Sequence, residues 1–379
     1  MIPDDVRRLL RTVVDPELRC DIVELGMVGD IAVQDDGTVD VTIKLTTSGC
    51  PLKAQIRDDI KARLRTDVRF EWTEMTAAEK STCMAVARKA ATERAVDTDI
   101  PITAKVIAIA SGKGGVGKSS VTVNLAAGLA HEGFTVGVLD ADIGGFSVPR
   151  MLGVEGRLAG ATDEKKIVPN SRRIGDGVVK VVSMGFLVDD EQSALLWRGQ
   201  VLQRAVQHFL EDVQWGDIDY LLIDMPPGTG DIQMGLARQL PRAELLVVTT
   251  PALAAQKVAA RAADLAAKTY LRVVGVIENM SSFTCEDGNT YALFGSGGGQ
   301  QLADDIGAPL LGSIPIEPVV SAGGDTGAPA VLGEGIAADA LRAIVRRIVD
   351  EAVPPADMAG CSARLLEKVE AALGPVPSP

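Results

Sequence analysis

The hydrophobic and polar positions along the chain follow two different patterns. Over the first part, apolar residues recur at helical spacing in residues 6–13 and again in residues 52–64. Two stretches with the composition of strands, residues 27–33 and 38–45, lie between them. This order of elements predicts a small α+β domain over residues 1–78.

From residue 105 onward, short apolar runs with the length of buried strands alternate with segments of helical periodicity. This alternation is typical of an α/β domain with a largely parallel sheet covered by helices on both faces, and we expect it over residues 105–350. Residues 79–104 are rich in Ala, Lys, Arg and Thr and are predicted to be a linker with one helix near residues 85–95. Residues 351–379 are predicted to be a tail with a short amphipathic helix.

A glycine-rich segment lies between a predicted strand, residues 106–110, and a predicted helix, residues 121–130. Its glycines allow backbone N–H groups to turn toward phosphate oxygens, and the start of the helix adds partial positive charge. Lys118 is expected to bind the β- and γ-phosphates of a nucleotide, and the Ser119 hydroxyl to bind Mg²⁺. The segment fits the phosphate-loop pattern, and its nucleotide-binding residues are Gly112, Lys113, Gly114, Gly115, Val116, Gly117, Lys118, Ser119 and Ser120.

Carboxylates follow two of the later predicted strands. Asp140 and Asp142 come after the strand at residues 135–139, and Asp224 ends the strand at residues 219–223. In open α/β sheets, ligands bind at the carboxyl ends of the strands. Asp224 is therefore expected to reach Mg²⁺ through water, as the acidic residue of a Walker B strand does.

The early lysine of the loop, Lys113, makes this segment resemble the deviant Walker A motif of an ATPase class that includes the MinD, ParA, ArsA and nitrogenase iron-protein families. In that class the early lysine reaches ATP across a homodimer interface, so the resemblance implies ATP-dependent dimerisation and catalytic roles for Lys113 and Lys118. It further implies that Asp142 orients the attacking water, that Asp140 supports Mg²⁺, and that Asn279 binds the adenine.

Several longer segments are more distinctive than this class motif. They are Ser147-Val148-Pro149-Arg150-Met151-Leu152-Gly153, Trp197-Arg198-Gly199, Pro226-Pro227-Gly228-Thr229-Gly230-Asp231 and Glu278-Asn279-Met280-Ser281. Together they resemble the Mrp/ApbC family of iron–sulfur cluster carriers over about residues 105–345. The resemblance implies a homodimeric, slow ATPase that binds iron–sulfur clusters and transfers them to apo client proteins. Its implied partners are these clients and iron–sulfur assembly factors.

The N-terminal region carries motifs of its own. Asp15-Pro16-Glu17, Leu25-Gly26-Met27-Val28 and Thr46-Thr47-Ser48-Gly49-Cys50-Pro51 are similar to the small domain of the SufT and PaaD type, which is associated with iron–sulfur assembly. Pro51 at the first position of a predicted helix puts Cys50 at the N-cap, where the helix dipole favours the thiolate. Cys50 is therefore a candidate to assist the cluster or the client, and a buried structural cysteine is the alternative.

The cysteines of the ATPase domain differ from the family pattern. Family members carry Cys-x-x-Cys soon after the Asn-Met element, whereas this chain has Cys285 with Gly288 at the partner position. A dimer would offer two thiolates, and a [4Fe–4S] cluster usually has four. We expect Cys285 to ligate a cluster with further ligands from Cys50, a small thiol or the client. The alternative is a nucleotide-switched scaffold or adaptor that carries no cluster. The glycines at 297–299 are expected to form a mobile loop nearby.

Composition restricts the partners. The chain has a net charge of −13 and only 3% aromatic residues, which disfavours a general nucleic-acid surface. The sequence has neither an apolar run of membrane-spanning length nor a signal pattern, so we expect a cytoplasmic protein without a membrane partner. A positioning ATPase of the ParA or MinD sort is correspondingly less favoured. Five scattered cysteines do not suggest a disulfide framework.

Overall fold

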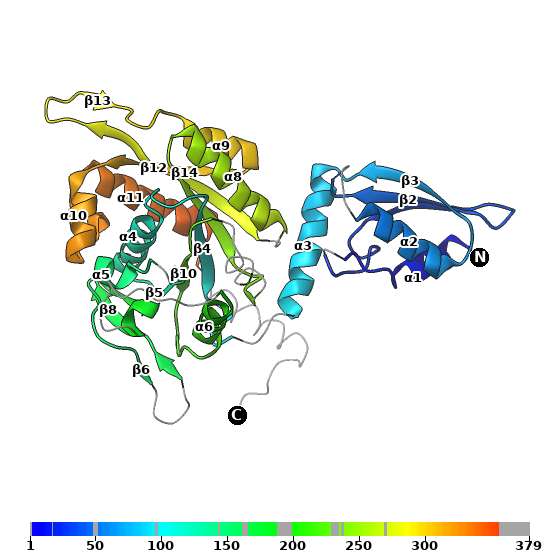
Figure 1. Ribbon diagram of the computed structural model, residues 1–379, viewed down its shortest axis with the longest axis horizontal. Helices are drawn as coiled ribbons and strands as arrows, with labels where there is room; N and C mark the ends of the chain where they lie inside the picture. The colour runs from blue at the N-terminus through cyan, green and yellow to red at the C-terminus, as the bar shows by residue number, and fades with distance from the viewer. Residues whose placement is uncertain are drawn as a thin grey trace, which may run out of the picture. The chain divides into compact units, whose positions relative to one another are not determined.

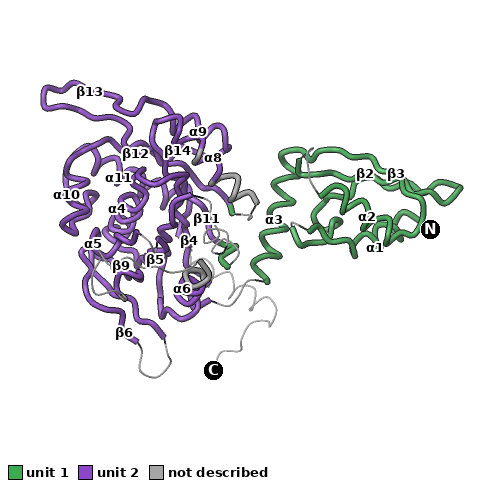
Figure 2. Tube along the Cα trace, in the orientation of Figure 1, with its two compact units in different colours: residues 1–96, 237–242, 267–271 green, residues 97–236, 243–266, 272–379 purple. Residues whose placement is uncertain are grey.

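The computed structural model describes residues 2–16, 18–47, 52–94, 98–142, 145–160, 166–187, 199–228, 235, 239–268 and 271–355 (Figure 1). They form two compact units (Figure 2). The first unit comprises Met1–Val96 with Ala237–Arg242 and Ala267–Leu271, and the second comprises Asp97–Leu236, Ala243–Ala266 and Arg272–Pro379. None of the described helices combines the length and the apolar composition needed to cross a bilayer.

The first unit is built on a three-stranded sheet in the order β1-β2-β3. Strand β1 (Val28–Val33) is antiparallel to β2 (Val39–Leu45), and β2 is parallel to β3 (Val68–Glu74). Buried residues alternate along β2, so one face of the sheet points into a core shared with α1 (Pro3–Leu10) and α2 (Lys53–Leu64). The α+β class predicted for this region is confirmed, although β3 was not predicted.

Helix α3 (Ala77–Glu93) corrects the expectation of a linker beginning at residue 79. Thr76 and Glu79 form a capping box at its start, in which the Thr76 side chain accepts from the Glu79 N–H and the Glu79 carboxylate accepts from the Thr76 N–H. Cys83 and Ala87 on this helix are buried in the core of the first unit. The polar composition of residues 79–94 reflects the exposed face of a packed helix.

The second unit contains a larger sheet whose described strands follow the order β13-β12-β11-β4-β10-β5-β9-β8, with β14 paired to β12. The pairs from β12 to β9 and the β12–β14 pair are parallel, whereas β13 and β8 are antiparallel to their neighbours. The predicted α/β fold with a mainly parallel sheet is confirmed. The strands are β4 (Lys105–Ser111), β5 (Thr135–Asp140), β8 (Asn170–Ile174), β9 (Gly177–Ser183), β10 (Tyr220–Asp224), β11 (Glu244–Thr249), β12 (Arg272–Thr284), β13 (Thr290–Tyr291) and β14 (Leu310–Ile316).

Helices flank this sheet, and the first of them follows the glycine-rich segment. Helix α4 packs on β5, β9 and β10 and against α11. The second unit also contains the short antiparallel pair β6 (Ala159–Gly160) and β7 (Ile167–Val168). Its helices are α4 (Lys118–His131), α5 (Val148–Leu152), α6 (Gly199–Glu211), α8 (Leu253–Lys268), α9 (Gly298–Ile306), α10 (Pro318–Thr326) and α11 (Ile336–Arg347).

One local expectation in this unit is corrected. Gly298 and Gly299 are buried in the first turn of α9 rather than in a mobile loop, because the Gly299 N–H donates to the buried Glu278 carboxylate. Strand β14 runs through Pro315 to Ile316. The C-terminal tail from residue 356, with its predicted amphipathic helix, lies outside the described residues.

The strand order brings the predicted functional residues to one edge of the sheet. Strand β10 lies between β4 and β5, and all three run in the same direction. Asp224 at the end of β10 is in register with Asp140 at the end of β5 and with Ile109, two residues before the end of β4. The phosphate-loop segment and both carboxylates therefore meet at the carboxyl edge.

Candidate functional site

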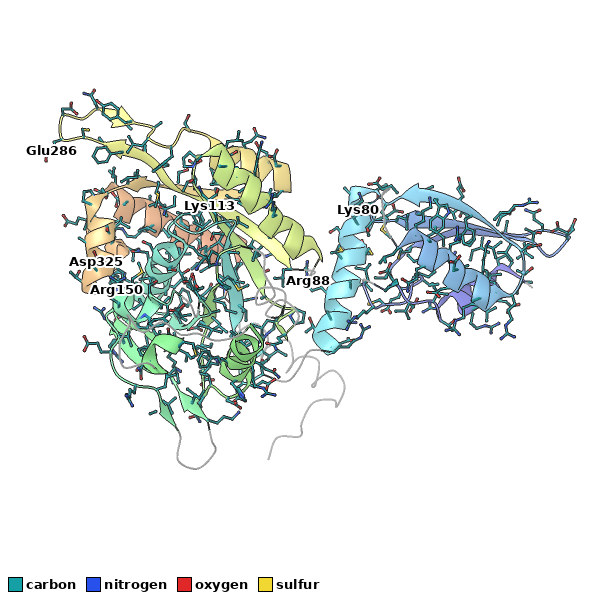
Figure 3. The ribbon with its side chains drawn as sticks, in the orientation of Figure 1. Lys80, Arg88, Lys113, Arg150, Glu286 and Asp325 are labelled. Carbon is teal, nitrogen blue, oxygen red and sulfur yellow. The ribbon has the colours of Figure 1, made fainter. Side chains whose placement is uncertain are left out.

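Two glycines of the glycine-rich segment have left-handed backbone conformations. Gly115 and Gly117 have φ angles of 78° and 80°, in the left-handed region that favours glycine. A Cβ atom added to Gly115 would meet nothing within 4 Å, whereas one on Gly117 would lie 2.2 Å from Asn279 Nδ2. Gly117 is thus required both for its conformation and for its contact, and α4 begins directly after it at Lys118. Lys113, labelled in Figure 3, lies in the same loop.

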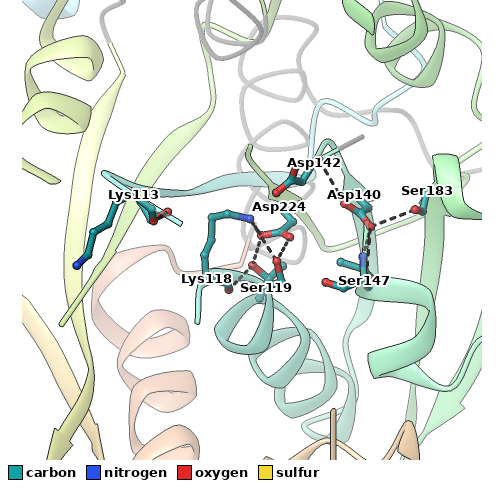
Figure 4. A network of polar contacts seen from close by, with 11 residues as sticks. Lys113, Lys118, Ser119, Asp140, Asp142, Ser147, Ser183 and Asp224 are labelled. Carbon is teal, nitrogen blue, oxygen red and sulfur yellow. Dashed lines mark hydrogen bonds and ion pairs between the residues drawn. The ribbon is translucent and has the colours of Figure 1, made fainter. Parts of the chain in front are cut away.

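Lys118, Ser119 and Asp224 form a buried cluster below this loop (Figure 4). Lys118 Nζ lies 2.5 Å from Asp224 Oδ1, and their side chains are only 6% and 1% exposed. Ser119 Oγ donates to Asp224 Oδ2 at 2.5 Å, and Thr122 Oγ1 lies 3.0 Å from Asp224 Oδ1. The structure therefore brings three of the predicted residues together. Thr122 was missed, although its position one helical turn after Lys118 puts it on the same face of α4.

Asp140 is also fully buried, and its carboxylate accepts hydrogen bonds from three backbone N–H groups and one hydroxyl group. Its Oδ2 accepts from the N–H groups of Ser147 and Val148 at 3.2 and 3.3 Å and from Ser183 Oγ at 3.1 Å. Its Oδ1 accepts from the Asp142 N–H at 3.3 Å. Asp140 thus holds the start of α5 against β9, and Ser147 and Ser183 are further residues that the sequence alone did not single out.

Asp142 lies beside this cluster and is half-buried. Burial raises the pKa of its carboxyl group; Lys118 lowers that pKa and Asp224 raises it further. No described residue donates a hydrogen bond to its carboxylate. Asp142 therefore has acceptor capacity that faces the region around Lys118.

The carboxylates at this edge fit a divalent cation that binds together with phosphates. Burial and the neighbouring charge of Asp224 raise the pKa of Asp140 to about 7, although the charge of Lys118 lowers it. The carboxylates of Asp140, Asp142 and Asp224 thus share the positive charge of Lys118. A cation here would supply the missing positive charge, and carboxylate and hydroxyl oxygens are the ligands that Mg²⁺ prefers. The described residues contain no group of three or more His, Cys, Asp or Glu arranged as a complete metal cage. Mg²⁺ bound with nucleotide phosphates does not need one.

Lys113 has a different environment from Lys118. It is exposed, and in Figure 4 its side chain points away from the Lys118–Asp224 pair. Ser111 Oγ donates to the Lys113 backbone oxygen at 3.0 Å, which fixes the loop without engaging the ammonium group. The ammonium group is directed to solvent in the single chain.

Asn279, on β12, forms a hydrogen bond to the phosphate loop. Its Nδ2 donates to the Val116 backbone oxygen at 2.9 Å, and the residue is buried. A cavity of about 300 Å³ opens beside it, between the loop, the ends of β12 and β14, and helices α5 and α10. Asn279 lines this cavity with one amide hydrogen already engaged, so its oxygen and its second amide hydrogen remain for a base.

Cys285 lies in the turn that joins β12 to β13. The Gly288 N–H donates to the Cys285 oxygen at 2.9 Å, and the Cys285 N–H donates to the Asn289 oxygen at 2.9 Å. Gly288 has a φ of 82° and open space around it. Cys285 is half-buried and is a free thiol, so the turn presents one cysteine where the family pattern has two.

Among the described residues, no other cysteine is exposed enough to serve as a second ligand. Cys20 and Cys83 are buried in the first unit, and burial raises the pKa of the Cys83 thiol to about 11. Cys50 and Cys361 lie outside the described residues. The same is true of Trp197, Arg198 and the segment from Thr229 to Asp231.

Comparison with known families matches both parts of the chain. Residues 102–349 match the family model described as NUBPL iron-transfer P-loop NTPase. The chain belongs to this family. Residues 3–71 match a second model, described as iron–sulfur cluster assembly protein. Both resemblances predicted from the motifs are therefore confirmed, and the second match ends before α3.

Curated members of the family are similar along most of their length. The iron–sulfur cluster carrier protein of Mycobacterium tuberculosis is 45% identical over 339 residues, which cover 86% of this chain and 87% of the relative. That of Deinococcus radiodurans is 42% identical over 356 residues, covering 92% and 95%. Among solved structures, a nucleotide-binding protein from Archaeoglobus fulgidus in complex with ADP is 36% identical with a TM-score of 0.50. That similarity covers 59% of this chain and 86% of the other.

Proposed function

We propose that this protein is a homodimeric, Mg²⁺-dependent ATPase that binds iron–sulfur clusters and transfers them to apoproteins. The observation that carries the nucleotide part is the buried cluster of Lys118, Ser119 and Asp224 at the start of α4. The cluster-carrying part is supported by membership of the family and by the curated relatives named as iron–sulfur cluster carriers.

Each residue of the site has a role in this proposal. Lys118 leaves Asp224 and donates to the β- and γ-phosphates, while Ser119 turns its hydroxyl oxygen to the metal. Bound Mg²⁺ supplies positive charge to the phosphate oxygens and to the acidic residues. Asp142 accepts a hydrogen bond from the attacking water and orients it, and Asp140 holds the loop that carries Asp142. Asn279 offers its side-chain oxygen to the adenine amino group.

Homodimerisation is supported by the two lysines of the loop. Lys118 is committed to the site of its own subunit, whereas Lys113 is exposed and points away from it. A second subunit facing the loop would receive this lysine at its nucleotide. Hydrolysis is slow in this proposal, since ATP serves to switch the dimer between states.

Cys285 ligates the iron–sulfur cluster in this proposal. One thiolate per subunit gives a dimer two ligands for a [4Fe–4S] cluster, and a small thiol or the client supplies the others. Incomplete ligation by the carrier suits transfer, because a client cysteine replaces an exogenous ligand without breaking a protein–iron bond first. Cys50 of the N-terminal domain is proposed to assist the cluster or the client.

Anaerobic reconstitution with iron and sulfide tests the carrier function. Iron content and visible absorption are measured for the wild type, Cys285→Ala and Glu286→Ala, which changes the same exposed turn but keeps the thiol. The proposal requires a cluster in the wild type and in Glu286→Ala and its loss in Cys285→Ala. Transfer of that cluster to an apo-ferredoxin must fall in parallel.

A second candidate is a nucleotide-switched scaffold or adaptor in iron–sulfur assembly that carries no cluster itself. The observation that favours it is Gly288, which leaves Cys285 as a single thiol in its turn. Failure of all three proteins to take up a cluster, with ATP binding intact by calorimetry, would establish this candidate instead. A positioning ATPase of the ParA or MinD sort is less favoured because the chain is strongly acidic.

A further inference from the structure

The cavity beside the phosphate loop adjoins the residues that are expected to bind the nucleotide phosphates. Gly117 and Ser120 line it from the loop and from α4, so the nucleoside attached to the phosphates extends into it. The ends of β12 and β14 contribute Met280, Pro315 and Ile316 to its walls. These apolar groups suit the faces of a planar base.

Polar side chains line the same cavity from α5 and α10. Arg150 Nη1 donates to Asp325 Oδ1 at 2.9 Å, and the side chains are 48% and 68% exposed (Figure 3). The two helices are tied together below this pair, because Arg172 Nη1 donates to the Leu152 and Gly327 oxygens at 2.5 and 2.6 Å. The position of the Asp325 carboxylate at the cavity is thus fixed by packed backbone.

Two other polar side chains of the cavity are partly engaged. Asn279 donates one amide hydrogen to the Val116 oxygen, and Glu317 Oε2 accepts from the Ala337 N–H at 2.8 Å at the start of α11. Asp325 uses only Oδ1 for Arg150, and its Oδ2 accepts no hydrogen bond from the residues that the structure describes. Asp325 therefore has an acceptor left for a ligand.

The charge of Asp325 restricts what it can face. A carboxylate repels the phosphates, and it bonds to groups that donate, which in a nucleoside are the ribose hydroxyls and the base amino group. The ribose lies between the phosphates at Ser120 and the base at the apolar wall. Arg150 compensates part of the negative charge so that the carboxylate can lie this near to a triphosphate.

We propose that Asp325 accepts a hydrogen bond from the ribose 2′-hydroxyl of the bound nucleotide and thereby selects ribonucleotides over 2′-deoxyribonucleotides. Arg150 is a positioning residue that holds the carboxylate toward the cavity. This inference rests on the proposed nucleotide-binding function and adds a specificity to the same site.

Calorimetric affinities of the full chain for ATP, 2′-deoxy-ATP and inosine triphosphate, each with Mg²⁺, test the assignment. A hydrogen bond to a charged group contributes about tenfold or more to affinity, so the wild type is expected to bind ATP at least about tenfold more tightly than 2′-deoxy-ATP. In Asp325→Ala this ratio falls to near one, because ATP binding weakens and 2′-deoxy-ATP binding does not. Arg150→Gln lowers the ratio, and Arg150→Lys retains it.

Asp339→Ala is the matched control, since Asp339 is an exposed aspartate paired with Arg342 at 2.7 Å on α11 and does not line the cavity. Its ATP to 2′-deoxy-ATP ratio remains that of the wild type. An unchanged ratio in Asp325→Ala overturns the inference and leaves the proposed function standing. A selective loss of the preference for ATP over inosine triphosphate would assign Asp325 to the base and overturn it too. A wild type that binds no nucleotide would overturn both proposals.

Discussion

Asp140 is a residue whose burial has a direct consequence for stability. Its pKa is raised from about 3.8 to about 7 by burial and by the charge of Asp224. A carboxyl group whose pKa is higher in the folded state binds its proton more tightly there. Without nucleotide and Mg²⁺, Asp140 therefore contributes stability below about pH 4 that is lost as the pH rises through about 7.

Urea unfolding of the protein in a chelator, repeated across this pH range, measures the effect. The free energy of unfolding is expected to fall toward pH 7 relative to that of Asp140→Asn, which cannot ionise at this position. Saturating Mg-ATP should reduce the fall, since the added cation favours the ionised carboxylate. A pH dependence identical in the wild type and Asp140→Asn would show that Asp140 is ionised without penalty.

Gly288 is the residue that separates this chain from the two-cysteine pattern. A Cβ atom at this position meets no neighbour within 4 Å, although the φ of 82° costs a residue with a Cβ about 1–2 kcal/mol. Gly288→Cys is expected to give a dimer four thiolates and hence a cluster that survives a chelator better than that of the wild type. Iron retention over time measures this.

Gly288→Ala is the control for that substitution, because it carries the same backbone strain without a thiol. Its cluster should be lost as fast as that of the wild type or faster. Equal retention in Gly288→Cys and Gly288→Ala would mean that the turn does not present position 288 to the cluster.

Among the elements, α5 and α10 form the wall of the cavity, and their contact depends on two glycines. Gly327 ends α10 with a φ of 69°, and a Cβ there would lie 2.5 Å from the Gly153 Cα atom. Gly327→Ala is expected to destabilise the second unit by about 2–4 kcal/mol, from backbone strain and overpacking, and to weaken ATP binding.

Gly307→Ala isolates the strain from the clash. Gly307 ends α9 with a nearly equal φ of 67°, but a Cβ there meets nothing within 4 Å. Chemical unfolding should show a loss of only about 1–2 kcal/mol, with ATP affinity unchanged. Similar ATP affinities in the two variants would mean that α5 and α10 do not need to touch for the cavity to form.

The elements that sequence reasoning predicted are those with continuous apolar runs and motifs. Strands β4, β5 and β10 are buried on both faces, so their sequences reveal both the strand and the residue at its end. Strand β3 was missed although Val68, Phe70 and Trp72 alternate with polar residues, which is itself a strand pattern. Helix α3 was judged by its polar composition, whereas its burial rests on a narrow stripe that includes Cys83 and Ala87.

The site was only partly accessible from sequence for a different reason. Lys118 and Asp224 were predicted because each belongs to a local motif. The role of Asp140 in holding α5 depends on Ser147, which precedes α5, and on Ser183, which ends β9; the two come together only in the folded chain. Arg150 and Asp325 are separated by 175 residues, and no local pattern connects them.

At the scale of the whole molecule, the first unit has a core of its own, to which α3 contributes. A fragment of residues 1–94 is expected to unfold cooperatively, while a fragment of residues 1–76 lacks Cys83 and Ala87 and is less stable. Thermal unfolding followed by circular dichroism compares the two. Equal midpoints would mean that α3 is dispensable for this unit.

Substitution of Lys113 tests the proposed dimer directly. Because the side chain is exposed and points away from Lys118, Lys113→Ala is expected to leave ATP binding by one subunit nearly unchanged. The missing cation at the partner's phosphates should lower hydrolysis by about 100-fold and abolish the dimer that forms with Mg-ATP. Light scattering after size exclusion and phosphate release measure the two effects.

Lys61→Ala, which removes an exposed lysine of the first unit, should match the wild type in both. If Lys113→Ala instead dimerises and hydrolyses ATP like the wild type, the early lysine acts in neither process and the trans-acting role fails.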